Sequence, residues 1–239
     1  MSEPDQQSRH DDARMPAPRE PVFNLPAIVV GSMGLCIAFH LIRSYLLSPE
    51  QDFGLLLRAA FIPLRYSGEF EIDIYALTTP VSYAFLHGSL AHLVINMIWL
   101  AAFGSPLANR LGAARFAMFW VVSALAAAGL HYALHPLDPA PLVGASGAIS
   151  GMMGAAARYG FQIDRSAAGA AFGGRTLPIA MVFRSRTVVT FLLVWMAINL
   201  ASGFISFVPG EENRIAWEAH VGGFLVGFLA IQYFEPRHA

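Results

Sequence analysis

The chain has 239 residues, of which 56% are hydrophobic and only 13% are charged, and its formal net charge is −1. Soluble domains carry about a quarter charged residues, so this composition predicts an integral membrane protein. A net charge near zero gives no bulk attraction for nucleic acid, and we expect no nucleic-acid partner. Cys36 is the only cysteine, which excludes an intrachain disulfide and a cysteine-based metal site.

The start of the sequence differs in character from the rest. Residues 1–25 are polar and proline-rich, which predicts a disordered tail. They contain no short apolar segment of the kind found in cleavable signal peptides. Residues 26–239 are much more apolar, and their length fits one compact domain.

The apolar residues fall into segments that predict membrane-spanning helices. Such a helix needs about 20 mostly apolar residues. Six segments reach or approach this length, at about residues 26–47, 90–110, 114–134, 146–159, 187–207 and 219–234. The fourth and sixth are short, so we expect their polar N-terminal ends to lie below the membrane surface. The predicted fold is an all-α bundle of six transmembrane helices with a membrane-embedded polar site.

The connections between these segments indicate the orientation in the membrane. Residues 48–88 are expected to form a long loop that contains an amphipathic interfacial piece at 53–62. With six spans, eleven of the fifteen arginines fall on the side of the two chain ends. Because arginine and lysine favour the cytoplasmic side, both termini are predicted to be cytoplasmic. We place the protein in the inner membrane of a bacterium.

Three of the predicted spans begin with polar residues on the same, outer side. The second carries His92 and Asn96, which are four residues apart and therefore share a helix face. The fourth begins at Ser146 and the sixth carries His220 in its first turn. Polar groups inside a bilayer are costly and face a bundle interior or a water-filled cavity. We therefore expect these side chains to share one site.

Small residues predict that the fourth and sixth spans pack closely. Glycines recur at helical spacing in both segments, at Gly147, Gly151, Gly154, Gly223 and Gly227. Small residues at this spacing let transmembrane backbones approach one another. Because Gly223 and Gly227 share a helix face with His220, this packing is expected to carry His220 toward Ser146.

These residue types support nucleophilic catalysis. A serine hydroxyl becomes a nucleophile when a base takes its proton, and a histidine titrating near neutral pH is such a base. The free N–H groups of the helix start at Ser146, with His92 and Asn96, would form an oxyanion site. Sequence places no acidic residue on the face of His220, and Glu218 is expected at the membrane edge. We therefore predict a Ser146–His220 dyad rather than a triad.

Three motifs within about residues 75–234 resemble those of the rhomboid intramembrane serine proteases. They are Gly-Ala-Ser-Gly at 144–147, His-x-x-x-x-His-x-x-x-Asn at 87–96, and Ala-His-Val-Gly-Gly with a further glycine at 219–227. The order and spacing agree with that family. The chain departs from many members in lacking a Trp-Arg pair in its first loop. It also has Ala108 where many members carry a glutamate.

The resemblance implies a role for each motif residue. Ser146 would be the nucleophile and His220 the base, while His92, Asn96 and Gly144 would help to hold the oxyanion. His87 would be structural, and the loop at about 204–217 would cap the site. The substrates would be transmembrane segments of other membrane proteins in the lipid bilayer, and no metal or cofactor would be needed. Oligomeric state is not predicted.

Each candidate residue also has a structural interpretation. Ser146 alone is compatible with a helix N-cap, and His220 alone with a buried core histidine. His131 and His135 are interpreted as solvated loop histidines rather than a metal pair, because the sequence shows no third ligand. For the whole chain, the alternative function is a non-catalytic rhomboid-like factor that binds and escorts membrane proteins. A small transporter is disfavoured, because internal repeats are absent from the sequence.

Overall fold

The computed structural model describes residues 25–165, 169–204 and 216–236. Most of the predicted tail and of the predicted cap loop therefore lies outside the described residues. The elements are almost all helical: α1 Ala27–Tyr45, α2 Pro49–Ala59, α3 Ile74–Ser82, α4 Leu90–Trp99, α5 Ser105–Leu111, α6 Ala113–Leu134, α7 Ser146–Arg158, α8 Ile179–Val182, α9 Arg186–Phe204 and α10 Trp217–Ala230. Short 3₁₀ turns lie at Pro63–Tyr66, Tyr83–Phe85 and Ile231–Tyr233, and strands Ile163–Asp164 (β1) and Ala171–Phe172 (β2) pair antiparallel.

Four helical stretches in the described part of the chain are long and apolar enough to cross a membrane. They are Ala27–Tyr45, Leu90–Leu111, Ala113–Leu134 and Arg186–Gly203, and each corresponds to a predicted span. The remaining two predicted spans are α7 and α10, with 13 and 14 residues. At 1.5 Å per residue these helices are about 20 Å long, shorter than the hydrocarbon core of a bilayer. The count of six spans therefore stays a prediction.

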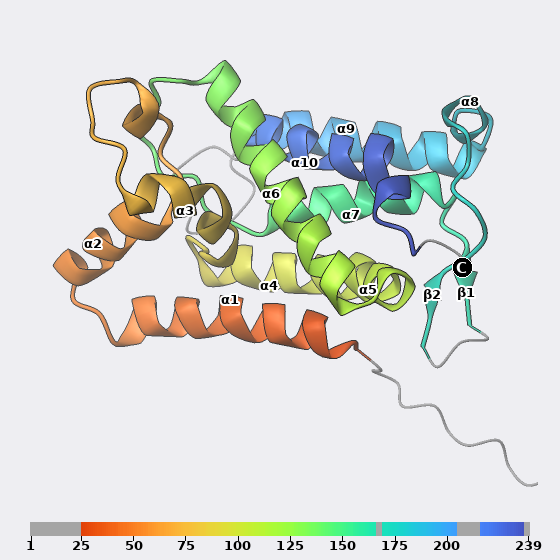
Figure 1. Cartoon of the computed structure of the whole chain (residues 1–239), viewed down its shortest axis with the longest axis horizontal. Helices are drawn as coiled ribbons and strands as arrows, with labels where there is room; N and C mark the ends of the chain where they lie inside the picture. Colours follow the sequence, from red (N-terminus) through yellow and green to blue (C-terminus); the bar gives the residue numbers. More distant parts are fainter. Residues whose placement is uncertain (1–24, 166–168, 205–215, 237–239) are drawn as a thin grey trace, which may run out of the picture.

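The short helix α7 is enclosed by the others. In Figure 1, α7 runs through the middle of the bundle, between α4 and α10 and behind α6. All of residues 147–158 are buried. A helix surrounded by protein does not need to match the lipid thickness along its own length. This arrangement lets the N-terminal end of α7 lie inside the bundle.

Contact between α7 and α10 is backbone against backbone, as the glycine pattern predicted. A Cβ atom at Gly223 would lie 1.9 Å from the carbonyl oxygen of Gly147. One at Gly227 would lie 1.8 Å from the carbonyl oxygen of Gly151. Only glycine permits both approaches, so the predicted close packing of these two segments is confirmed.

The second span is not one uninterrupted α-helix. A π-helical turn, Leu100–Gly104, separates α4 from α5. Pro106 lies in the first turn of α5 and has no N–H to complete the regular helical ladder. Gly112 then ends α5 with φ at +77°, a conformation that favours glycine, and α6 begins at the next residue.

The long connection expected over residues 48–88 contains two helices, of which α2 overlaps the amphipathic piece predicted at 53–62. Ser48 and Gln51 form a reciprocal capping box at the start of α2, and Pro49 occupies its first turn. Asp73 caps α3 through the N–H of Ala76. Capping side chains therefore start both helices, with a first-turn proline in α2. No residue of α2 is buried, which agrees with an interfacial piece.

Connections gather at the two ends of the bundle. Figure 1 shows α2 and α3 at one end, and α8 and the β1–β2 pair at the opposite end. Arg43 pairs with Asp52 at 2.6 Å at the first end, and Arg110 pairs with Glu235 at 3.2 Å toward the other. Arg110 also donates to the carbonyl of Phe172 in β2, so Glu235 and the connection around 160–186 share one end, which agrees with the predicted topology. Which end faces the cytoplasm stays a prediction.

Candidate active site

Ser146 is the first residue of α7, and the loop before it is tightly fixed. The preceding Gly144 has φ at +123°, which L side chains rarely adopt. A Cβ at Gly144 would lie 2.9 Å from the Nε2 atom of His92. The N–H of Gly144 donates to the carbonyl of Tyr83 at 3.1 Å. Glycine at 144 therefore lets the chain pass beside His92 and present Ser146 at a helix start.

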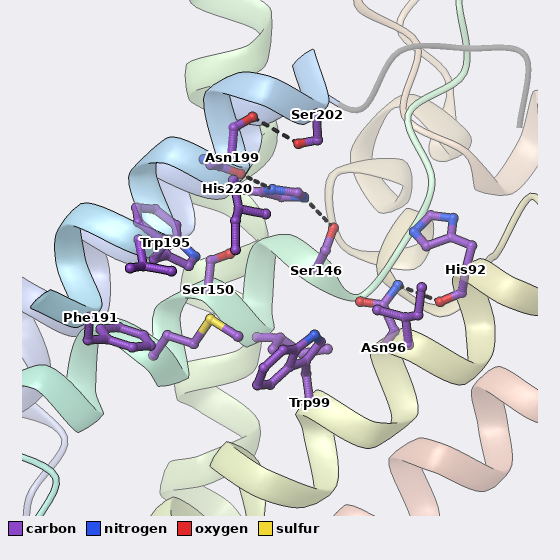
Figure 2. Close-up of a pocket in the computed structure, with 15 residues that line it drawn as sticks. His92, Asn96, Trp99, Ser146, Ser150, Phe191, Trp195, Asn199, Ser202 and His220 are labelled. Carbon is purple, nitrogen blue, oxygen red and sulfur yellow. Dashed lines mark hydrogen bonds between the residues drawn. The ribbon is translucent and has the colours of Figure 1, made fainter. Parts of the chain in front are cut away.

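His220 is hydrogen-bonded to Ser146. Its Nε2 atom lies 2.7 Å from the Ser146 hydroxyl oxygen, and a dashed line marks this hydrogen bond in Figure 2. The two residues are 74 positions apart in sequence and meet because α10 packs on α7 through glycine. This distance is within the reach that proton transfer between a serine and a histidine requires.

Asn199 also contacts His220, and the sequence reasoning missed it. Its side-chain oxygen lies 2.6 Å from the other ring nitrogen, Nδ1, so that His220 lies between Asn199 and Ser146 (Figure 2). Asn199 belongs to α9, is 4% exposed and interrupts a run of apolar residues. A polar amide within a spanning helix is itself a signal of a functional site, and this signal was available in the sequence.

His92 and Asn96 lie on the other side of Ser146, on α4 (Figure 2). Asn96 is 4% exposed, and its side-chain amide donates to the backbone carbonyl of His92 at 3.1 Å. The ring of His92 packs edge-on against His87, with 5.1 Å between centroids. Both predicted oxyanion residues thus face the same cavity as Ser146, while their role in catalysis stays a prediction.

These residues line one cavity of about 450 Å³. Its volume is typical of sites that bind small organic groups. Side chains of α4, α7, α9 and α10 line it: His92, Ile95, Asn96, Trp99, Ser146, Ile149, Ser150, Met153, Phe191, Val194, Trp195, Ile198, Asn199, Ser202 and His220. The polar groups cluster near Ser146, and large apolar side chains form the walls. Ser146 and His220 are each partly buried between these walls, and reduced contact with solvent strengthens the electrostatic interactions of a hydroxyl–imidazole pair.

His87 lies near the site without lining the cavity. It is 1% exposed. Burial lowers the pKa of its imidazole to about 3, and nearby His92 adds to this effect. A histidine that is neutral throughout the physiological range and packs on His92 suits the structural role that was predicted for it.

The structure overturns one expectation about the residues near α10. Glu218, which was expected at the membrane edge, is covered by the bundle and 4% exposed, and its depth in the membrane stays a prediction. His131 was interpreted as a solvated loop histidine, yet it lies in α6, is 5% exposed and places Nδ1 2.7 Å from a Glu218 carboxylate oxygen. His135 is half-exposed and lies 3.4 Å from the same oxygen. This pairing could not be predicted from the sequence, because Glu218 and His131 are far apart in the chain and meet only where α6 packs against α10.

We expect the Glu218–His131 pair to contribute to stability. Replacing His131 with alanine would leave a buried carboxylate without its main partner, which costs about 3–5 kcal/mol in unfolding free energy. Replacing both residues with apolar ones of similar volume, His131→Leu with Glu218→Leu, should be much less harmful. Unfolding of the three proteins in the same detergent tests this, and equal stability of His131→Ala and wild type would contradict it.

The described residues contain no group of three or more His, Cys, Asp or Glu side chains arranged to hold a metal ion. The hydroxyl–imidazole arrangement provides its own nucleophile and base. The site geometry therefore favours serine-type chemistry.

Comparison with known proteins matches the chain to one family. The family model described as Rhomboid domain matches residues 75–237. The rhomboid protease GlpG of Serratia proteamaculans (strain 568) is 29% identical over 158 residues, covering 66% of this chain and 48% of the relative. The rhomboid protease GluP of Bacillus subtilis (strain 168) is 29% identical over 159 residues, or 65% of this chain and 25% of the relative.

A plant protein is similar as well. RHOMBOID-like protein 5 of Arabidopsis thaliana is 26% identical over 198 residues, which cover 81% of this chain and 56% of the relative. Across these three relatives, the matched region spans between 25% and 56% of the relative's length. The similarity therefore concerns a shared domain, and the relatives contain much sequence beyond it.

Proposed function

The chain belongs to the rhomboid family, and from this premise we propose that it is an intramembrane serine endopeptidase. Family membership and four apolar helices make it an integral membrane protein. The observation that carries the proposal is the 2.7 Å hydrogen bond between His220 Nε2 and the Ser146 hydroxyl, inside a cavity. Relatives named rhomboid proteases GlpG and GluP support the same activity.

In the proposed reaction, Ser146 and His220 act as nucleophile and base. The Ser146 oxygen forms a bond to the carbonyl carbon of the scissile peptide while His220 takes the hydroxyl proton at Nε2. His220 then gives that proton to the leaving amine as the C–N bond breaks, which leaves an acyl-enzyme. Water, deprotonated by the same imidazole, hydrolyses the ester and frees Ser146.

The negative oxygen of the tetrahedral intermediate needs hydrogen-bond donors. The first N–H groups of α7 have no partner within the helix, and they lie beside the Ser146 hydroxyl. We assign His92 and Asn96 as side-chain donors from α4, and Gly144 as the residue whose conformation lets the backbone approach. Loss of one such donor typically lowers kcat by about 10²–10³-fold.

The proposed substrates are transmembrane segments of other proteins. A segment in the bilayer satisfies its backbone groups as a helix, so a scissile bond becomes accessible only where that helix unwinds. We therefore expect preference for segments that contain glycine or proline near the cleavage site. We further propose that the protein resides in a bacterial inner membrane with both termini in the cytoplasm, because of the arginine distribution.

Labelling and cleavage test the proposed function. The purified protein and Ser146→Ala are treated with a fluorophosphonate probe and, separately, with a membrane-anchored substrate. Wild type is expected to be labelled and to cleave, and Ser146→Ala to do neither. Equal labelling or cleavage by the variant would refute the nucleophile assignment. Absence of both from folded wild type would favour the alternative, a non-catalytic factor that binds membrane proteins.

A further inference from the structure

The hydrogen bonds of Asn199 indicate a specific role for this residue, which is not part of the proposed Ser146–His220 pair. We propose that Asn199 is a positioning residue, which fixes the tautomer and the orientation of His220 and ties both to helix α9. This inference rests on the proposed function only for its catalytic consequence. The hydrogen-bond geometry on which it depends can be tested independently of activity.

The neighbours of Asn199 determine which way its amide points. The amide nitrogen lies 3.1 Å from the backbone carbonyl of Trp217, which can only accept a hydrogen bond. The nitrogen therefore faces Trp217, and the side-chain oxygen faces His220 Nδ1 at 2.6 Å. Because an amide oxygen only accepts, the proton of neutral His220 must lie on Nδ1.

This assignment leaves Nε2 of His220 as an acceptor. The Ser146 hydroxyl, 2.7 Å away, then donates its proton to Nε2. Only this tautomer allows the imidazole to act as a general base toward Ser146, since a proton on Nε2 would reverse the hydrogen bond. Asn199 would thus hold the neutral ring in its reactive form before substrate arrives.

Asn199 also mechanically connects two helices. It lies on α9 and binds both the first residue of α10, Trp217, and the fourth, His220. The indole of Trp217, on α10, packs on Gly203 of α9, where an added Cβ would lie 2.5 Å from a ring carbon. Movement of α9 relative to α10 would therefore disturb the base directly.

Much of α9 is exposed, and Asn199 is one of its few buried residues, together with Val188 and Ser202. Leu193 and Ile198 on this helix are 66% and 63% exposed, whereas Asn199 is 4% exposed. The nearest carboxylate in sequence, Glu218, is occupied by His131 at 2.7 Å. A neutral amide therefore takes the position that a carboxylate holds in a Ser-His-Asp triad, as an amide does in Cys-His-Asn proteases. The predicted dyad lacks this third residue.

Two substitutions separate positioning from simple packing. Asn199→Leu keeps the number and branching of the side-chain heavy atoms and removes both hydrogen bonds. Because the base is then misplaced, kcat is expected to fall about 10²-fold with little change in KM. Asn199→Asp retains an acceptor toward Nδ1 and adds a negative charge that favours imidazolium. Its pH–rate profile should therefore lose activity at a higher pH than wild type on acidification. Asn109→Leu, on α5 outside the cavity, is the control and should retain wild-type kinetics.

Nitrogen-15 spectra of histidine provide the readout that needs no activity. In Ser146→Ala protein, the signal absent from the Ser146→Ala/His220→Gln double variant identifies His220. We expect an Nδ1–H tautomer when Asn199 is present, and a mixture of tautomers or the Nε2–H form in Asn199→Leu. An unchanged tautomer, or Asn199→Leu with wild-type kcat and pH profile, would overturn the inference. Wild type that is inactive yet shows the Asn199-dependent tautomer would instead refute the proposed function alone.

Discussion

Replacing His220 with alanine is expected to lower kcat for a membrane-anchored substrate by about 10⁴-fold, because Ser146 loses the ring nitrogen that is hydrogen-bonded to its hydroxyl. Binding of the substrate segment depends mainly on the cavity walls, so KM should change little. The measurement is the cleavage rate of purified protein reconstituted in vesicles. His135→Ala is the matched control, since His135 is half-exposed and does not line the cavity, and it should cleave at nearly the wild-type rate.

The same assignment fixes the direction of the pH dependence. Imidazolium cannot accept the Ser146 proton, so the wild-type rate should fall as the pH is lowered and His220 becomes protonated. His220→Ala should show only a residual rate without this acid limb. If His220→Ala retained wild-type kcat, or if its residual rate kept the same acid limb, another residue would have to be the base.

Whether a site residue could be predicted depends on how far apart in the sequence the residues that define its position lie. Ser146, His92 and Asn96 belong to short motifs, and helical periodicity places each on a helix face. The meeting of His220 with Ser146 is a contact over 74 positions, yet it was foreseen. The reason is that glycine spacing reports close helix packing directly. Here sequence carried information about a tertiary contact.

Asn199 and Glu218 show where this reasoning stopped. Asn199 is the strongly polar residue within the apolar run of α9, and this signal was present in the sequence but was not used. No local pattern shows which face of α9 turns inward, so its partner His220 could not be predicted. Pairing of Glu218 with His131 depends on the crossing of α6 and α10, which no spacing encodes. The amphipathic piece predicted at 53–62 overlaps α2, whereas α3 was not predicted. The start of α2 was also missed, although a serine cap followed by a first-turn proline, as at Ser48 and Pro49, is a helix-start signal. The prediction of six spans depends on the length of each apolar segment. Segment length does not indicate whether a short helix that is enclosed by protein crosses the membrane.

Replacing Gly227 with alanine is expected to separate α10 from α7 and to abolish most activity. The new Cβ would lie 1.8 Å from the carbonyl oxygen of Gly151 and 2.6 Å from the backbone nitrogen of Ala155. Both are backbone atoms, so no rotamer change can relieve the overlap and the helices must move apart. Overpacking of this kind costs about 1–3 kcal/mol in unfolding free energy. A shift of about 1 Å between His220 and Ser146 would lower the rate by about 10²-fold.

Gly129→Ala provides the control for this prediction. Gly129 lies within α6, and a Cβ there meets no atom within 4 Å. Alanine in a helix interior is favoured over glycine by about 0.5–1 kcal/mol, so Gly129→Ala should be neutral or slightly stabilising. Thermal unfolding in one detergent and cleavage in vesicles would be measured for both variants. Gly227→Ala with wild-type stability and rate would show that the α7–α10 contact tolerates a methyl group. Close packing would then not be what holds His220 against Ser146.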